Sequence, residues 1–114
     1  MKIIHLSSPN FSKRKRSINS IKFIIIHYTG MQSERESIKR LCSPSSKVSS
    51  HYLVNRKGEI FNFIKDLSVA WHAGKSRWGK YKNLNENSIG IELVNKGHAF
   101  GYKKFKKKQI LSLI

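Results

Sequence analysis

The stretch Ile21-Lys22-Phe23-Ile24-Ile25-Ile26-His27-Tyr28-Thr29 decides the fold of this chain. Its apolar residues occupy both phases of the alternation, and the run is too short and too β-branched to favour a helix. We therefore predict a strand that is buried on both faces and lies in the middle of a sheet. His27 stands at the end of this strand, where a rigid scaffold can present a binding or catalytic side chain. A hydrogen-bonded structural histidine is the alternative interpretation.

Length and composition limit the kinds of protein that the sequence can encode. The 114 residues suit one domain with a single core, and an apolar content of 39% favours a folded domain over a disordered chain. No apolar run reaches the roughly 20 residues that span a bilayer. Residues 1–11 contain no apolar segment of signal-peptide length. We expect a protein without a membrane span, cytoplasmic by default, or periplasmic if its N-terminus is incomplete.

The chain is strongly basic, because 23 Lys and Arg residues stand against 6 Asp and Glu residues, for a net charge of +17. Such a charge predicts attraction to polyanions, so a nucleic-acid-binding protein is one interpretation. Much of the excess, however, lies in two clusters at residues 13–16 and 103–108, which match no nucleic-acid-binding module. The sequence therefore does not favour nucleic acid as the partner. Cys42 is the only cysteine, which excludes an internal disulfide and a thiolate cage around zinc.

The elements around the first strand can be predicted in chain order. Residues 1–20 are expected to form a loosely ordered basic lead-in, and residues 21–114 the folded domain. Ser33 begins a capping box for a short helix over residues 34–41. Residues 48–54 and 59–64 alternate in polarity on either side of a turn, which predicts a β-hairpin.

The second half of the chain carries two further signals. Residues 66–81 contain Trp71, Trp78 and glycines without any periodicity, and we expect them to form the wall of a cleft. A helix begins near Phe105 and carries an apolar stripe to Ile114 without a C-cap, which suggests that its continuation is missing.

A carboxylate interrupts the last predicted strand, residues 88–94. Ile89, Ile91 and Leu93 point to one layer, whereas Gly90 and Glu92 point to the other. A buried unpaired carboxylate is costly, so we expect Glu92 to have a cation, a metal-bound water or a catalytic duty beside it. A salt bridge to a lysine at the sheet edge is the alternative.

Four blocks of the sequence occur together in one order. They are Phe23-Ile-Ile-Ile-His-Tyr-Thr29, Val48-Ser-Ser-His-Tyr-Leu-Val54, Ala70-Trp-His-Ala-Gly74 and Asn87-Ser-Ile-Gly-Ile-Glu-Leu93. With these blocks, residues 21–114 resemble the zinc-dependent N-acetylmuramoyl-L-alanine amidases of the type 2 amidase family, relatives of the peptidoglycan recognition proteins. The resemblance implies an α/β fold, a small mixed β-sheet with flanking helices, incomplete at the C-terminus.

The resemblance also implies roles for individual residues. His27 would be the first zinc ligand and Glu92 the catalytic acid/base, with Trp71, His72 and His51 lining or supporting the substrate cleft. Zinc lowers the pKa of bound water to about 7, and a nearby carboxylate can take its proton and pass it to the leaving nitrogen. In the family the other two zinc ligands follow the helix that begins here near Phe105. We therefore expect an incomplete Zn2+ site, unless a second polypeptide supplies the missing segment.

The function implied by the resemblance is hydrolysis of the amide bond between N-acetylmuramic acid and L-alanine of the peptidoglycan stem peptide, in cell-wall turnover or recycling. A truncated form would have low or no activity. Two alternatives stay open, namely a non-catalytic muropeptide-binding module and a basic nucleic-acid-binding protein.

Overall fold

The computed structural model describes residues 2–74, 76–95 and 105–113. Its main feature is a five-stranded sheet with the strand order β1-β5-β4-β9-β3. The five strands are β1 (Ile3–His5), β3 (Phe23–Tyr28), β4 (Tyr52–Val54), β5 (Ile60–Asn62) and β9 (Ser88–Leu93). Strand β9 runs parallel to β3 and β4, whereas β4 is antiparallel to β5. The sheet is therefore mixed, and the predicted α/β class is confirmed.

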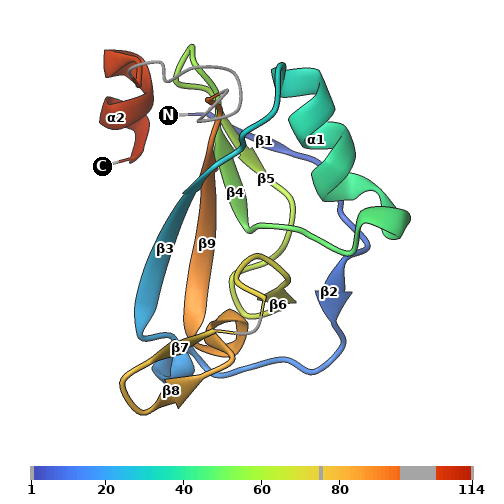
Figure 1. Ribbon diagram of the computed structural model, residues 1–114, viewed down its shortest axis with the longest axis vertical. Coiled ribbons are helices and arrows are strands. Elements are labelled where there is room, and N and C mark those ends of the chain that lie inside the picture. The colour runs from blue at the N-terminus through green and yellow to red at the C-terminus, as the bar shows by residue number, and fades with distance from the viewer. Residues whose placement is uncertain (1, 75, 96–104, 114) are drawn as a thin grey trace.

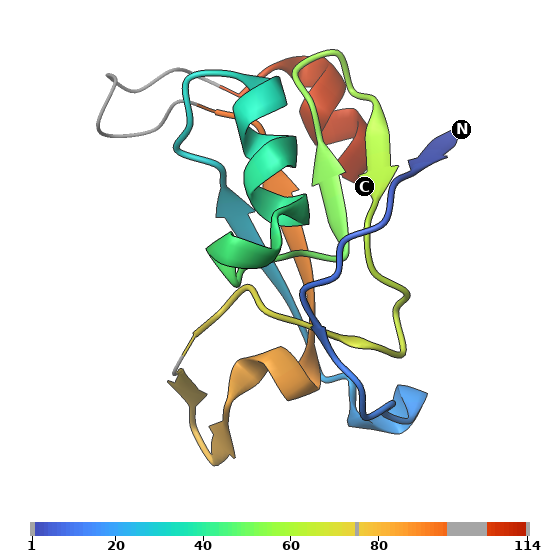
Figure 2. The ribbon, with the colours of Figure 1, turned by 90° about the vertical axis from the view of Figure 1, so that its right-hand side faces the viewer.

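Two α-helices lie on opposite sides of this sheet (Figure 1). They are α1 (Glu34–Cys42) and α2 (Lys107–Leu113), and Figure 2 shows α1 in front of the strands. Ser33 is the N-cap of α1, as predicted, because its hydroxyl accepts a hydrogen bond from the Glu36 backbone N–H. No helix among the described residues is both long and apolar enough to cross a membrane.

Short elements make up the rest of the described chain. Two more strand pairs form outside the main sheet, and three 3-10 turns connect the elements. The strand pairs are β2 (Phe11–Ser12) with β6 (Val69–Ala70) and β7 (Arg77–Trp78) with β8 (Tyr81–Lys82); the turns are η1 (Ile18–Ser20), η2 (Pro44–Ser46) and η3 (Leu84–Asn87).

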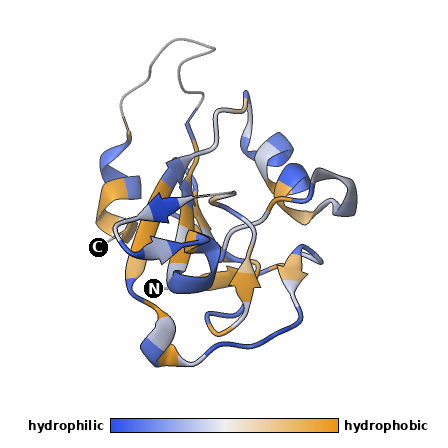
Figure 3. Cartoon of the chain, turned by 60° about the horizontal axis from the view of Figure 1, so that its bottom comes forward, coloured by the Kyte–Doolittle hydropathy of each residue, from blue (hydrophilic) through white to orange (hydrophobic). Residues whose placement is uncertain are grey.

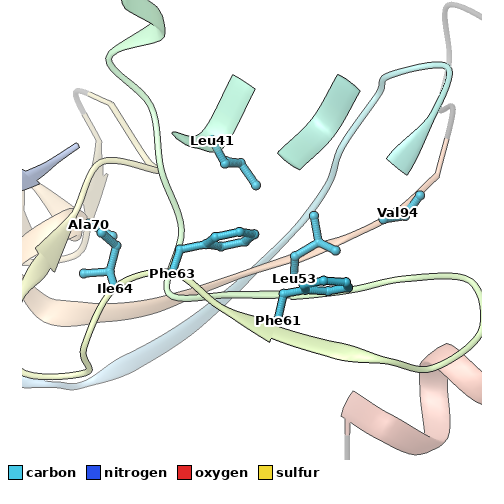
Figure 4. Close-up of a cluster of buried hydrophobic side chains, with 7 residues drawn as sticks. All are labelled: Leu41, Leu53, Phe61, Phe63, Ile64, Ala70 and Val94. Carbon is cyan, nitrogen blue, oxygen red and sulfur yellow. The ribbon is translucent and has the colours of Figure 1, made fainter. Parts of the chain in front are cut away.

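The larger apolar cluster fills the space between α1 and the sheet (Figure 4). Leu41 reaches down from α1 onto side chains of β4, β5 and the segments that follow them. On the other face of the sheet, Val54, Ile60 and Leu93 form a smaller cluster against which Leu113 of α2 packs. Figure 3 shows hydrophobic residues along the strands, whereas each helix carries both kinds of residue. The larger cluster consists of Leu41, Leu53, Phe61, Phe63, Ile64, Ala70 and Val94.

The prediction that the first strand lies mid-sheet is wrong. Strand β3 is at the edge of the sheet and has β9 as its neighbour on one side. Its outward face is exposed, with relative accessibilities of 68% for Ile24 and 52% for Tyr28. An apolar run shows that both faces can be buried, but it does not show which neighbours cover them. The strand flanked on both sides at the site is instead β9.

The predicted hairpin is confirmed, with shorter strands than expected. Its turn is held by Asn55, whose Oδ1 accepts hydrogen bonds from the backbone N–H groups of Lys57 and Glu59. Gly58 in this turn has a φ of 84°, which favours glycine, and α2 lies directly against it. A Cβ on Gly58 would approach the Lys108 carbonyl oxygen to 2.7 Å, so the turn and the helix fit only with glycine there.

The prediction of a loosely ordered lead-in is also wrong for the described residues before η1. Strand β1 pairs with β5, and β2 pairs with β6. Between them, Ser8 and Asn10 are buried. Ser8 donates to the Leu41 carbonyl oxygen of α1, and Asn10 donates to carbonyl oxygens of the α1–β4 connection. Polar side chains that bond to backbone leave no apolar periodicity, so the sequence carried no signal for this packing. The boundary between a lead-in and a domain at residue 21 stays a prediction.

Helix α2 also differs from its prediction, because the residue that it buries among its described residues is polar. Gln109 is 0% exposed, and its Nε2 donates to the carbonyl oxygens of Val54, at 3.3 Å, and Val94, at 2.9 Å. Ile110 and Leu111 of the expected apolar stripe are exposed, and Ile114 lies outside the described residues. The helix is thus attached to the strand ends by hydrogen bonds as well as by Leu113.

We expect Asn10→Ala to destabilise the protein. The Asn10 side chain donates to the Ser43 and Val48 carbonyl oxygens, both at 2.8 Å, and its loss leaves them without that donor. The expected loss is about 1–3 kcal/mol of unfolding free energy, measured by urea denaturation. Asn19→Ala is the control, since Asn19 is exposed. Equal stability of the two variants would show that the N-terminal segment contributes nothing to the fold.

Candidate active site

One cleft gathers four of the five predicted site residues. His27, Trp71, His72 and Glu92 all line a cavity of about 160 Å³. The cleft lies between α1 and the ends of β3 and β9, and Arg40 of α1 borders it as well. The complete lining is His27, Tyr28, Thr29, Met31, Ser37, Arg40, Leu41, Val48, Ser49, Trp71, His72 and Glu92.

The pairing of β3 with β9 brings His27 and Glu92 together. The two residues are direct partners in the parallel ladder, so both side chains leave the sheet on the same face. Residues Ile24 and Ile26 take the opposite face and are exposed there. The prediction that Glu92 shares a face with Gly90 inside an apolar strand is therefore confirmed by the structure.

Glu92 is a partly buried carboxylate with an unsatisfied oxygen. Its Oε2 is buried and has no hydrogen-bond partner among the described residues. Burial raises the pKa of Glu92 to about 7, and the positive charge of Arg40 opposes this shift in part. The expected alternative, a salt bridge from Glu92 to a lysine, does not form among the described residues. A carboxyl group with this pKa can both accept and release a proton near neutral pH.

The imidazole rings of His27 and His72 contact each other in the cleft. Nε2 of His27 lies 3.1 Å from Nδ1 of His72, and Nε2 of His72 lies 3.0 Å from Oγ of Ser88. Burial lowers the pKa of His27. Burial, followed by the charges of His27, His51 and Arg16, lowers the pKa of His72 to about 3. Both rings are therefore neutral near pH 7, which is the form in which imidazole binds metals.

His72 is held in place at its backbone by Asn85 and at its ring by Gly90. Its backbone N–H and that of Ala73 donate to Oδ1 of Asn85, at 3.0 and 2.7 Å. Its ring lies directly on Gly90, where a Cβ would come within 2.5 Å of two ring carbons. Gly90 is thus required for close approach of the ring.

His51 is not among the residues that line the cleft, and of the two roles expected for it, lining or supporting, its position fits the second. The residue is 0% exposed. Its Nδ1 accepts from the Gly90 backbone N–H at 3.1 Å, and its Nε2 lies 2.8 Å from the Ser68 carbonyl oxygen. Both ring nitrogens are therefore used by backbone groups, which leaves His51 a supporting role beside β9. Residue type alone does not distinguish a buried histidine of this kind from one that faces solvent.

Trp71 forms the wall of the cleft, whereas Trp78 does not. The Trp71 backbone N–H donates to Ser49 Oγ at 2.9 Å, and the indole N–H donates to Ser12 Oγ at 3.0 Å. Trp78, on the β7–β8 hairpin, is 69% exposed and lies outside the lining. Sequence reasoning missed Arg40, because a charged residue on a short helix looks like part of a solvated face.

The raised pKa of Glu92 predicts a specific pH dependence of stability. The folded state holds its proton up to about pH 7, whereas the unfolded carboxyl, with an ordinary pKa of 4.5, has already released it. The folded state is therefore penalised increasingly as the pH rises from 4.5 to 7. Glu92→Gln should gain melting temperature relative to the unsubstituted protein across this window. A constant difference between the two melting curves would contradict the burial of this charge.

Comparison with known proteins assigns the chain to a family. The family described as N-acetylmuramoyl-L-alanine amidase matches residues 17–114. The chain is 42% identical over 84 residues to the N-acetylmuramoyl-L-alanine amidase AmiD of Escherichia coli, which covers 68% of this chain and 29% of AmiD. It is 29% identical over 105 residues to the 1,6-anhydro-N-acetylmuramyl-L-alanine amidase AmpD of Haemophilus influenzae, covering 77% and 56% of the two proteins.

A solved structure supports the same assignment. The complex of E. coli AmiD with the substrate anhydro-N-acetylmuramic acid-L-Ala-D-γ-Glu-L-Lys superimposes with a TM-score of 0.72 at 35% identity, covering 89% of this chain and 44% of AmiD. The chain thus spans between about a third and about half of the length of these relatives. Because the family match extends over most of its residues, this chain belongs to the N-acetylmuramoyl-L-alanine amidase family.

Proposed function

We propose that the cleft between α1 and β9 hydrolyses the amide bond between N-acetylmuramic acid and L-alanine of a peptidoglycan stem peptide. One observation carries this proposal. Oε2 of Glu92 is buried without a hydrogen-bond partner among the described residues, and Glu92 is the ladder partner of His27. An unsatisfied buried carboxylate costs stability, and a catalytic role would explain why the protein has one here. The family match and the substrate bound in the AmiD complex, an anhydromuramyl peptide, support this choice of substrate class.

Glu92 would act as the general base and then as the general acid. With a pKa of about 7 it can take a proton from the attacking water and return it to the nitrogen of L-alanine as the C–N bond breaks. The departing amine then leaves as a neutral group, and Glu92 returns to its starting state. Trp71 and Arg40 border the same cleft and would contact the ligand, with His72 beside them.

The residues of the cleft fit one side of a zinc site. Zinc dependence is general in this family, and when bound the ion would supply an acidified water and charge stabilisation at the carbonyl oxygen. His27 is the residue that would hold it, because its ring is neutral and faces the cleft beside the unsatisfied oxygen of Glu92. The described residues contain no cluster of three or more His, Cys, Asp or Glu suited to a metal. His98 lies outside the described residues.

Two earlier expectations stay predictions. One is the contribution of a second polypeptide to the metal site, and the other is the location, cytoplasmic or periplasmic. Neither changes the roles proposed for His27 and Glu92.

Hydrolysis of a muramoyl peptide tests the proposal directly. The chain, supplied with Zn2+, is incubated with anhydro-N-acetylmuramoyl-L-Ala-D-γ-Glu-L-Lys, and mass spectrometry follows release of the tripeptide. We expect slow release that Glu92→Gln lowers by about a hundredfold or more. Peptide binding without any release would instead support the non-catalytic muropeptide-binding module. Binding of an oligonucleotide that weakens steeply with salt, without peptide binding, would support the nucleic-acid-binding protein.

Trp71 should contribute to ligand binding through its position in the cleft wall. We expect Trp71→Ala to raise the dissociation constant of the same peptide about tenfold, which corresponds to about 1.4 kcal/mol. Calorimetric titration with Zn2+ absent measures this without turnover. Trp78→Ala is the matched control, because Trp78 is exposed outside the cleft and its loss should leave affinity unchanged. The opposite ranking of the two variants would place the binding site on the β7–β8 hairpin.

A further inference from the structure

A chain of hydrogen bonds leads from the backbone of η3 to His27, and its direction can be derived atom by atom. The Ser88 hydroxyl lies 2.6 Å from the Leu84 carbonyl oxygen, which can only accept. Ser88 therefore gives its hydrogen to Leu84. If the hydroxyl pointed elsewhere, two oxygen lone pairs would face each other across this short distance.

The direction of the next bond follows from the first. With its hydrogen committed to Leu84, the Ser88 oxygen is an acceptor for Nε2 of His72, 3.0 Å away. His72 then carries its hydrogen on Nε2. A neutral imidazole has one N–H group and one lone pair, so the Nδ1 atom of His72 presents the lone pair.

The last bond reaches the proposed metal ligand. Nδ1 of His72 lies 3.1 Å from Nε2 of His27, and a lone pair on the first atom requires a hydrogen on the second. His27 is then protonated on Nε2, and its own lone pair is on Nδ1. The hydrogen between the two neutral rings is thus on Nε2 of His27. The Leu84 carbonyl group determines this tautomer through Ser88 and His72.

We propose that His72 and Ser88 are positioning residues that fix His27 in the Nε2–H tautomer, so that Nδ1 is the atom offered to a metal ion. The inference rests on the proposed function, because it takes His27 as a metal ligand. Metals bind the unprotonated nitrogen of imidazole, and a hydrogen bond from the other nitrogen fixes both the tautomer and the orientation of the ring. Usually a carboxylate or backbone carbonyl accepts this bond, whereas here a second imidazole does so.

The surroundings of His72 suit such a role. Asn85 binds the backbone on both sides of the peptide bond from His72 to Ala73, and the ring lies against Gly90 without room for a Cβ. A ring held in this way has little freedom to rotate, so its Nδ1 stays directed at His27. A positioning group has to be rigid to select one tautomer of its neighbour.

Nitrogen-15 NMR of the metal-free chain tests the tautomer. Long-range proton–nitrogen correlation spectra distinguish protonated from unprotonated imidazole nitrogens. We expect His27 and His72 both to be protonated on Nε2. His72→Ala removes the acceptor, and His27 should then populate both tautomers. Ser88→Ala should free the tautomer of His72 in the same way.

His72→Asn is the matched control for the loss of the acceptor. The Oδ1 atom of asparagine is attached to the same side-chain carbon position as Nδ1 of histidine, so it can still accept from His27. We expect this variant to restore the Nε2–H tautomer of His27, which a purely structural role of His72 would not predict. The wild-type spectrum and this variant decide the question even if His72→Ala fails to fold.

Zinc is the second probe, and it separates this inference from the proposed function. Titration with Zn2+ should perturb Nδ1 of His27, with an affinity about 10- to 100-fold weaker in His72→Ala than in the wild-type protein or His72→Asn. A His27 protonated on Nδ1 in the metal-free protein would overturn the inference. If His27 is protonated on Nε2 as expected but zinc leaves its Nδ1 resonance unchanged, His27 is not a metal ligand. The proposal that its tautomer serves metal binding would then be overturned.

Discussion

The parallel pairing of β3 with β9 is the constraint on which the rest of the site depends. In a parallel ladder the register fixes which residues stand beside each other, and here it sets His27 next to Glu92. A slip of one residue would turn these side chains to the face where Ile24 and Ile26 are exposed. The placement of His27 beside Glu92 is therefore as well defined as the ladder itself, which extends over all six residues of both strands. Such placement on strands is more precise than placement on loops.

Hydrogen bonds from buried polar side chains to backbone position the loops around this pair. His51 links the backbone of β9 to Ser68, and Asn85 binds the backbone at His72. The Ser49 hydroxyl accepts a hydrogen bond from the Trp71 backbone N–H and donates one to the Asn10 carbonyl oxygen. The apolar clusters are small in comparison, so these polar residues do much of the ordering that a larger core would do in a longer chain. Each such bond also satisfies a backbone group that burial would otherwise leave unpaired.

The arrangement accounts for the unusual electrostatics of the cleft. Burial acts in opposite directions on the two kinds of group, raising the pKa of Glu92 while lowering those of His27 and His72. In each case the neutral form is favoured, because the charged form loses its hydration. The result is a cleft with neutral imidazoles beside a carboxyl group that can exchange its proton. The positive charge of Arg40 moderates the pKa shift of Glu92, although the two residues do not form a salt bridge.

Local sequence predicted the parts of the structure whose signals are local. The Ser33 cap, the hairpin around Asn55 and the alternation that points Glu92 into the cleft all follow from short patterns, and the structure has them. The approximate membership of the site was also visible, since four of five named residues line one cleft. Those signals are strong because capping, turn geometry and strand alternation each depend on neighbours along the chain.

The tertiary structure alone decided which surfaces meet. The position of β3 at the sheet edge, the burial of Gln109 and the ordering of the segment around Asn10 depend on partners far away in the chain. The same holds for the two histidines that sequence treated alike, because His51 binds the backbone of β9 whereas His72 faces His27. The sequence determined that histidines, a tryptophan and a glutamate would gather at strand ends. Which nitrogen or oxygen of each is free was decided by long-range hydrogen bonds, for which the residue type carries no local signal.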